Sequence, residues 1–344
     1  MRRLLPEWVA QSAVLLAWPD EETDWAPILS EVRVEYSGLI RAIAQHEKAL
    51  VLVRDRERAR QMCGAFDAAT RSQVVPVIAD FDDTWTRDYG PLALADGNAA
   101  CLVDFCFDGW GGKFAADRDD RLTRSLHADG LFGDINLSRH GRVLEGGALD
   151  TDGTGVALCN RDTFAARDPR ASTKELESWL RETLGLDHIL WLHDTQLAGD
   201  DTDGHVDTLA RFANPANILF QGCDDPADEH YAMLANLSVQ LGDLRTREGS
   251  PYHLHALPMP RPVLVDGVRL PASYANFLVI NDAVLVPAFG DPADARACEV
   301  VKAAFPDREV AGIPSTALLR QSGGVHCVTM QIPSVVPLAW VTMQ

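Results

Sequence analysis

The sequence predicts an α/β fold that repeats one unit five times. In each unit two short strands form a hairpin, and a helix and a further strand complete it. Two observations indicate this: short apolar runs of alternating polarity come in pairs around turn residues, and helical periodicity follows most of the pairs. A doubly wound open sheet is the competing architecture, but its helices alternate with single strands, whereas these strands are paired.

The hairpins are expected where turn dipeptides interrupt an apolar run, at 91–95 with 100–105, within 148–159, at 208–212 with 218–221 and at 277–280 with 284–287. Helices are expected at 30–45, where Ser30 can cap the first turn, and at 172–184, 226–241 and 292–305. The remaining strands are expected at 8–18, 49–53, 188–192 and 325–332.

We expect residues 1–344 to form a single catalytic domain. The length of 344 residues allows two domains, but no linker of Gly/Ser-rich or Pro-rich composition divides the chain. Repeated units pack on their neighbours and favour a radial arrangement, in which the last strand closes on the first. The segment 325–332 is the expected closing strand.

The net charge of the chain argues against nucleic acid as a partner and favours a cationic ligand. The chain holds 50 acidic and 31 basic residues, which gives a net charge of −19. Such a field repels nucleic acid and anionic membranes and concentrates cationic ligands, although it also serves solubility alone. We expect a small cationic substrate as the partner, with no nucleic acid and no membrane. A homo-oligomer is left open.

Seven cysteines are scattered along the chain in an odd number and without a Cys-x-x-Cys pair, which fits neither a disulfide framework nor a zinc knuckle. Pro6 and Glu7 break the first apolar run at once, which argues against a signal peptide. No apolar run approaches the roughly 18 residues needed to cross a bilayer. A reducing cytoplasm is the expected compartment, and no cofactor is expected.

Cys327 is the candidate nucleophile. A cysteine in an apolar run is most often a core residue, but Gly323-Gly324 precedes this one and permits close approach of a ligand. In an extended strand His326 points to the opposite face from Cys327, so it is not the expected proton-transfer partner.

His205 is the candidate general acid and base. If its segment is extended, Asp203, His205 and Asp207 lie on one face, where a carboxylate can orient the imidazole. The plainer reading is a surface histidine in an acidic loop. A calcium loop starting at Asp201 fails because a histidine and Phe212 occupy required ligand positions. A transition-metal site of histidine and aspartate stays open as an alternative, although no metal is expected.

Asp88 is a candidate carboxylate for a planar cation. It follows Arg87 at the start of a predicted hairpin, and Trp85 offers an aromatic face for cation–π contact. The alternative is an Arg87–Asp88 pair that only stabilises the turn. Glu145 repeats the arrangement of an acid beside a glycine turn.

Four motifs occur in an order similar to that of the agmatine deiminase family: Trp85-Thr86-Arg87-Asp88-Tyr89-Gly90-Pro91, Glu145-Gly146-Gly147, residues 204–212 and residues 323–331. The likeness extends over nearly the whole chain. It implies the five-bladed α/β propeller, or pentein, of guanidine-modifying enzymes, in agreement with the five units.

The resemblance also implies roles for single residues. Cys327 matches the nucleophile, His205 the general acid and base, and Asp88 and Asp207 the acids that grip the guanidinium. Further positions match the substrate pocket, namely Trp85, Trp110, Glu145, Asp201, Gly323 and Gly324. Two positions depart from the family pattern, Ala148 and the stretch Ala166-Arg167-Asp168-Pro169.

The implied reaction converts agmatine to N-carbamoylputrescine and ammonia through a covalent amidino-thioether. Deimination of arginine, peptidyl arginine or another alkylguanidine is the near alternative. A metal-dependent hydrolase that uses residues 201–207 and a non-enzymatic binding propeller are the alternatives from other classes.

Overall fold

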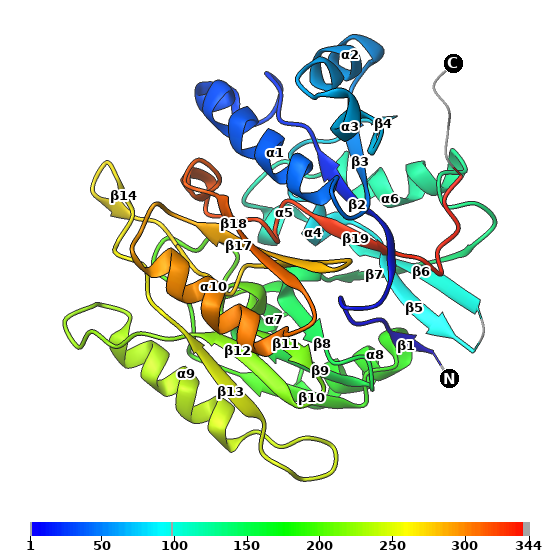
Figure 1. The fold of residues 1–344 in the computed structure, drawn as a ribbon. Coiled ribbons are helices and arrows are strands. Elements are labelled where there is room, and N and C mark those ends of the chain that lie inside the picture. The colour runs from blue at the N-terminus through cyan, green and yellow to red at the C-terminus, as the bar shows by residue number, and fades with distance from the viewer. Residues whose placement is uncertain (1, 98, 340–344) are drawn as a thin grey trace. The chain divides into compact units, whose positions relative to one another are not determined.

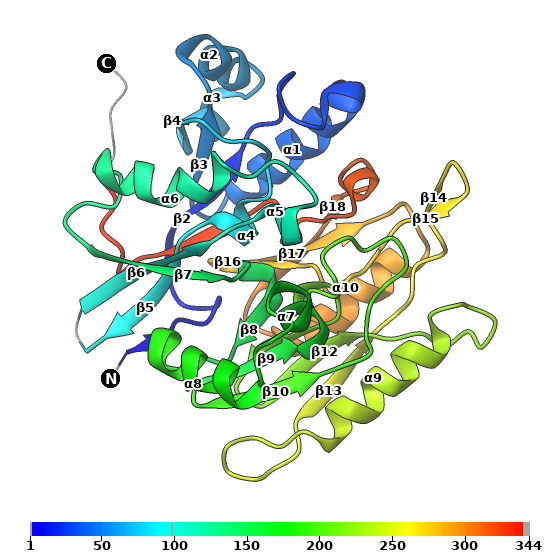
Figure 2. The ribbon, with the colours of Figure 1, turned by 180° about the vertical axis from the view of Figure 1, so that it is seen from behind.

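The computed structural model describes residues 2–97 and 99–339 (Figures 1 and 2). The chain falls into two compact units. The first unit comprises Met1–Leu5, Val9–Gly146 and Cys327–Gln344. The second comprises Pro6–Trp8 and Gly147–His326. Both ends of the chain therefore belong to the first unit, while three residues near the N-terminus belong to the second.

The last strand of the chain pairs with one of the first, as predicted. Strand β19 (Met330–Pro333) is antiparallel to β2 (Gln11–Ala17), with Met330 opposite Leu15. Next come β3 (Lys48–Val53) and β4 (Val74–Ile78), both in parallel register. Most of β2 and β3 is buried, which explains their continuous apolar sequence.

A second sheet in this unit has the order β1 (Arg3–Leu4), β5 (Leu92–Asp96), β6 (Ala99–Cys106) and β7 (Asn136–Val143). The hairpin predicted around Asp96-Gly97 is confirmed, because β5 and β6 are antiparallel and Asp96 lies opposite Ala99. Gly97 has φ +64°, a left-handed conformation that favours glycine.

The helices of the first unit are α1 (Leu29–Ile43), α2 (Arg56–Gly64), α3 (Ala68–Arg71), α4 (Thr86–Tyr89), α5 (Gly109–Gly112) and α6 (Asp119–Ala128), with a 3-10 turn at Ala26–Ile28. The predicted cap Ser30 is wrong: Ile28 is the N-cap of α1, and Ser30 lies in the first turn. Sequence analysis missed α2, whose N-cap Asp55 accepts hydrogen bonds from two backbone amides.

Three sheets of the second unit repeat one pattern, in which two antiparallel strands are followed by a parallel one. Their strands are β8 (Leu149–Thr151), β9 (Val156–Asn160) and β10 (His188–Leu192), then β11 (Ala210–Asn214), β12 (Asn217–Gln221) and β13 (His253–Leu257), then β16 (Leu278–Ile280), β17 (Ala283–Ala288) and β18 (Glu309–Pro314). A small ribbon joins β14 (Leu264–Val265) to β15 (Val268–Arg269).

The helices of the second unit are α7 (Arg161–Arg167), α8 (Thr173–Leu184), α9 (Tyr231–Asp243) and α10 (Ala293–Ala304), and further 3-10 turns span Gly146–Ala148, Val206–Thr208 and Leu318–Gln321. Ser172 and Glu175 form a capping box at the start of α8, and Gly185 ends it in the left-handed region. Helix α9 begins later than predicted because the side chains of Asp225 and Asp228 bind backbone amides and form turns.

Helices α9 and α10, both labelled in Figure 1, each contribute buried side chains to a hydrophobic core of the second unit. Leu234, Leu237 and Leu241 of α9 are buried in one cluster with residues of β10 and β12. Ala297 and Val301 of α10 belong to another cluster with residues of β12 and β17. Each helix therefore links two successive sheets. No helix within the described ranges is long and apolar enough to span a membrane.

Replacing Leu237 by alanine should destabilise the protein by about 2–5 kcal/mol, because the side chain is fully buried and leaves a cavity. Urea unfolding followed by circular dichroism measures the change. Val239→Ala on the same helix is the control, since Val239 is 63% exposed and should cost less than about 1 kcal/mol. Equal effects of the two variants would contradict the packing described for α9.

Candidate active site

Cys327 lies in a turn, and not in the predicted strand. Residues 325–329 form no strand, and β19 begins only at Met330. Cys327 is 7% exposed, and its carbonyl oxygen accepts a hydrogen bond of 3.2 Å from the backbone amide of Arg87. The Arg87 guanidinium reaches Gln331 Oε1 at 2.5 Å. Arg87 therefore ties α4 to the segment that carries Cys327.

Asp88 and Trp110 come together in the first unit. Asp88 is 5% exposed, and its Oδ2 accepts a hydrogen bond of 3.0 Å from Trp110 Nε1. Trp110 has φ 58° and ψ 49°, a left-handed conformation that is uncommon for a bulky residue. Strained backbone of this kind concentrates at functional sites. The indole therefore orients the carboxylate predicted to bind a cation.

Trp85 and Glu145 are buried next to α4. Trp85 is the N-cap residue of α4, and its ring packs at 5.5 Å from the ring of Trp25. Glu145 is 1% exposed, and the Gly146 that follows it lies against the carbonyl oxygen of Arg87, where a Cβ would collide. Glycine is required there because two backbone segments approach closely.

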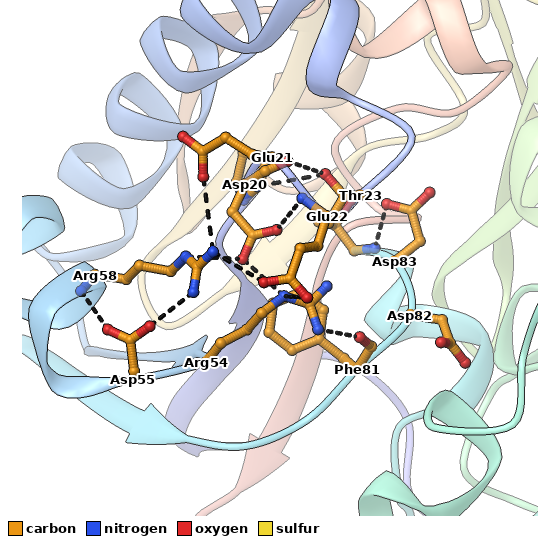
Figure 3. A network of polar contacts seen from close by, with 12 residues as sticks. Asp20, Glu21, Glu22, Thr23, Arg54, Asp55, Arg58, Phe81, Asp82 and Asp83 are labelled. Carbon is orange, nitrogen blue, oxygen red and sulfur yellow. Dashed lines mark hydrogen bonds and ion pairs between the residues drawn. The ribbon is translucent and has the colours of Figure 1, made fainter.

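A buried arginine anchors the segment that leads into α4 (Figure 3). Arg54 Nε lies 2.8 Å from Asp20 Oδ2, and its Nη1 donates to the carbonyl oxygen of Phe81 at 2.6 Å. The guanidinium also stacks over the Phe81 ring at 4.4 Å. Arg58 lies 3.5 Å from the same carboxylate of Asp20. These contacts define where the chain turns towards Trp85.

Asp83 lies in this segment two residues before Trp85 (Figure 3). Burial raises the pKa of Asp83 to about 7, against the opposing effect of the Thr84 amide, and the charge of Asp24 adds to the increase. The folded protein therefore keeps a proton on this carboxyl group at pH values where an unfolded chain releases it.

Asp83→Asn should remove a pH dependence of stability. The pKa of Asp83 is higher in the folded state, so the wild type loses stability as pH rises from about 4 to 7, whereas asparagine does not titrate. The free energy of unfolding of the variant, relative to that of the wild type, should increase by more than about 1 kcal/mol from pH 5 to pH 8. Urea unfolding at both pH values measures this change. Asp134→Asn, at an exposed site in the same unit, is the control and should show no such gain. A pH-independent difference between Asp83→Asn and wild type would contradict this pKa.

In the second unit His205 ends a tight acidic loop. Asp200 accepts hydrogen bonds from the backbone amides of Thr202, at 3.0 Å, and Gly204, at 2.7 Å. Asp203 has φ 65° and Gly204 has φ 87°. The predicted extended alternation of Asp203, His205 and Asp207 is therefore wrong, because side-chain hydrogen bonds to the backbone bend the segment. Asp207 instead lies in the 3-10 turn Val206–Thr208.

Residues of β9 and α7 anchor the same loop from outside. Asn160 Nδ2 donates to the carbonyl oxygen of Gly204 at 2.7 Å, and Arg167 Nη1 lies 2.6 Å from Asp203 Oδ2. Arg167 belongs to the stretch in which the sequence departs from the family pattern. Asp203 thus holds the loop in place. His205, two residues further along, is buried at 1% exposure.

Asp207 is fully buried and remains a carboxylate. Burial alone would raise its pKa, but the hydrogen bond with His326 and the charges of His326, His205 and Arg211 hold that pKa below its usual value. His326 Nδ1 lies 2.7 Å from Asp207 Oδ2, and Asn276 Nδ2 lies 3.2 Å from the same oxygen. His326 was expected to point to the opposite face from Cys327 because an extended strand was predicted here. That premise is wrong, since the segment is a turn.

Sequence analysis missed the residues behind Asp207. His326 Nε2 lies 2.7 Å from Glu7 Oε1, and Arg211 Nη2 lies 2.5 Å from Glu7 Oε2. Arg211 Nε also contacts Asp150 Oδ2 at 3.1 Å. Arg211 is a charge inside an apolar strand and is 1% exposed, a pattern that indicates a buried ion pair. For Glu7 the sequence carries no comparable signal.

The remaining predicted residues of this unit have simple environments. Gly323 and Gly324 are buried, and a Cβ on Gly324 would collide with Asn276 Oδ1. Ser322, with φ 62°, adopts the left-handed conformation that the glycine pair was expected to supply. Asp201 is half-buried in the acidic loop. Over residues 2–97 and 99–339, no three side chains of the His, Cys, Asp and Glu types group in a way that could hold a metal ion.

The family model of Porphyromonas-type peptidyl-arginine deiminases matches residues 3–333. The chain belongs to this deiminase family. An agmatine deiminase of Stutzerimonas stutzeri is 32% identical to it over 95% of this chain and 94% of the relative.

Solved structures agree with this assignment. A protein of Porphyromonas gingivalis, provisionally assigned as an arginine deiminase, is 43% identical, with a TM-score of 0.91 over 97% of this chain and 99% of that one. An agmatine deiminase of C. jejuni with substrate bound, in which serine replaces a cysteine, is 29% identical, with a TM-score of 0.90 over 97% of both chains. The α/β fold is therefore that of known deiminases.

Proposed function

We propose that this chain is an agmatine deiminase, which hydrolyses the guanidinium of agmatine to N-carbamoylputrescine and ammonia. The observation that carries the proposal is the similarity to a curated agmatine deiminase over 95% of this chain, at 32% identity. The four sequence motifs support it, because each supplies a residue type that guanidine chemistry requires.

We further propose that residues 1–344 form one catalytic domain with the five-bladed propeller arrangement. Five sheets of the described chain share an antiparallel strand pair and a parallel third strand, and in one of them the antiparallel pair is β19 with β2, which supports this proposal.

Substrate binding is assigned to two carboxylates. A guanidinium is planar and permanently charged, and its paired N–H groups match carboxylate oxygens. Asp88 is oriented by Trp110, and Asp207 is held ionised by its neighbours. Trp85, Glu145, Asp201, Gly323 and Gly324 are assigned to substrate binding as well.

Cys327 and His205 are assigned the covalent chemistry. The Cys327 thiol loses its proton to His205 as the sulfur adds to the guanidinium carbon, and His205 passes that proton to the departing ammonia, which leaves an amidino-thioether. His205 then takes a proton from water as the water oxygen adds to the same carbon. The carbon–sulfur bond breaks, the product is released, and the proton on His205 restores the thiol. The cysteine-to-serine form of the C. jejuni enzyme with bound substrate supports a cysteine nucleophile.

Because the surroundings of Cys327 are acidic, we expect the bound substrate to take part in activating the Cys327 thiol. Nearby carboxylates stabilise the neutral thiol, and a bound cation offsets them and favours the thiolate. Cys327 would therefore be an ordinary thiol without ligand and a nucleophile once the guanidinium is bound. We place the protein in the cytoplasm, where thiols stay reduced, since none of its seven cysteines, all among the described residues, forms a disulfide.

Deimination of arginine or of peptidyl arginine is the second candidate. The name of the matching family and the provisional assignment of the Porphyromonas gingivalis structure favour it. The substrates differ at the far end, where agmatine carries an ammonium and no carboxylate. A strongly acidic chain favours the substrate with two positive charges.

The kcat/KM for ammonia release should be at least about tenfold higher with agmatine than with arginine, because the carboxylate of arginine is repelled by the acidic protein.

Cys327→Ser should lower turnover by about a thousandfold or more, since removal of a nucleophile eliminates the covalent route. Cys63→Ser, in the same unit on α2, is the matched control and should retain activity. Faster turnover of arginine or a blocked arginine peptide would select the second candidate, and near-normal activity of Cys327→Ser would exclude the covalent mechanism.

An amidine-bearing cationic alkylating reagent should modify Cys327 about tenfold or more faster than a neutral reagent of equal intrinsic reactivity. The bound cation is expected to lower the pKa of the thiol, which the neutral reagent cannot do. Peptide mass spectrometry over time gives both rates, with Cys63 in the same sample as the reference thiol. Equal rates at Cys327 would rule out activation by the substrate's charge.

A further inference from the structure

Behind Asp207, five buried or nearly buried charged side chains form a continuous chain in the second unit. His326 lies between two carboxylates, at 2.7 Å from Asp207 through Nδ1 and at 2.7 Å from Glu7 through Nε2. Glu7 in turn contacts Arg211 at 2.5 Å, and Arg211 contacts Asp150 at 3.1 Å. His326 immediately precedes Cys327 in the sequence.

We propose that Glu7 is a positioning residue that keeps His326 protonated on both ring nitrogens, so that His326 holds Asp207 as an oriented carboxylate for the guanidinium. This inference rests on the proposed function for the identity of the bound cation. It assigns no contact between Glu7 and substrate.

When Asp207 and Glu7 are both ionised, hydrogen-bond chemistry requires both protons on His326. An ionised carboxylate only accepts hydrogen bonds, and a neutral imidazole has one N–H and one lone pair. A neutral His326 would therefore direct a lone pair at one of two carboxylate oxygens only 2.7 Å away. An imidazolium donates to both, and such charge-assisted bonds are short and about twice as strong as neutral ones.

Charge balance leads to the same protonation state. With His326 protonated, the two cationic side chains His326 and Arg211 face the three acidic side chains Asp207, Glu7 and Asp150, which leaves one negative charge, and His205 is the further titratable group near Asp207. A guanidinium would supply the missing positive charge. With His326 neutral, two negative charges would be left in a region where His326 and Asp207 are each 1% exposed, at a high desolvation cost.

The backbone around Glu7 is held by contacts that do not involve the Glu7 carboxylate. The carbonyl oxygen of the adjacent Trp8 accepts a hydrogen bond of 3.0 Å from Arg308 Nη2. The adjacent Pro6 packs against Gly153, where any side chain would collide with the proline ring. The backbone around Glu7 is therefore fixed independently, and Glu7→Gln changes mainly the charge.

For Glu7→Gln we expect kcat/KM for agmatine to fall about tenfold at pH 8.5 and to approach the wild-type value at pH 6. Without the carboxylate His326 binds its second proton less tightly, so the active, protonated form is lost at lower pH and the alkaline limb of the profile moves to lower pH. Glu177→Gln, which replaces an acid bonded to Trp191 elsewhere in the second unit, is the matched control with an unchanged profile. Glu7→Asp should restore the wild-type profile in part. A Glu7→Gln profile that coincides with the wild-type profile would overturn the proposal.

A direct measurement does not depend on turnover. In ¹⁵N-histidine-labelled wild type, both ring nitrogens of His326 should give protonated resonances at pH 7.5, with the signal assigned by its loss in His326→Gln. A neutral ring there would overturn the proposal, even if Glu7→Gln failed to fold. If another guanidine proved to be the substrate, the proposed function would fail, while the NMR result and the pH shift with that guanidine would still test Glu7.

Discussion

Keeping the carboxylate of Asp207 ionised away from water is the constraint on which much of the second unit depends. A buried carboxylate tends to take up a proton, and neutralising partners must prevent this. His326 and Asn276 supply contacts to one oxygen, and Arg211 adds charge from a distance. The short segment Pro6–Trp8 joins this unit and brings Glu7 to His326.

In the first unit a carboxylate is likewise held by neighbouring hydrogen-bond donors, but different residues supply them. Its carboxylate Asp88 receives an indole N–H from Trp110, and Arg87 ties α4 to the segment of Cys327. Arg54 and Asp20 hold the preceding chain in place. In both units a carboxylate is thus oriented by donors that do not react themselves, which is the preorganisation that binding of a planar cation needs.

Local patterns predicted much of the fold. The hairpin at Asp96-Gly97 and the capping box at Ser172 depend on residues within four positions, so a short window contains the information. Errors arose where polar side chains bind nearby backbone. The loop at Asp200 bends the segment expected to be extended, and the turn before Met330 shortens the closing strand.

The sequence by itself determined the strand and helix periodicity, the net negative charge and the motifs that carry Asp88, His205, Asp207 and Cys327. Only the tertiary structure decided their neighbours. Glu7 and His326 lie 319 positions apart, and Asp207 and His326 lie 119 apart. Hydrogen bonds and ion pairs act over a few ångströms in space, whatever the separation along the chain, so no local pattern announces such partners. A lone arginine in an apolar strand was the nearest signal.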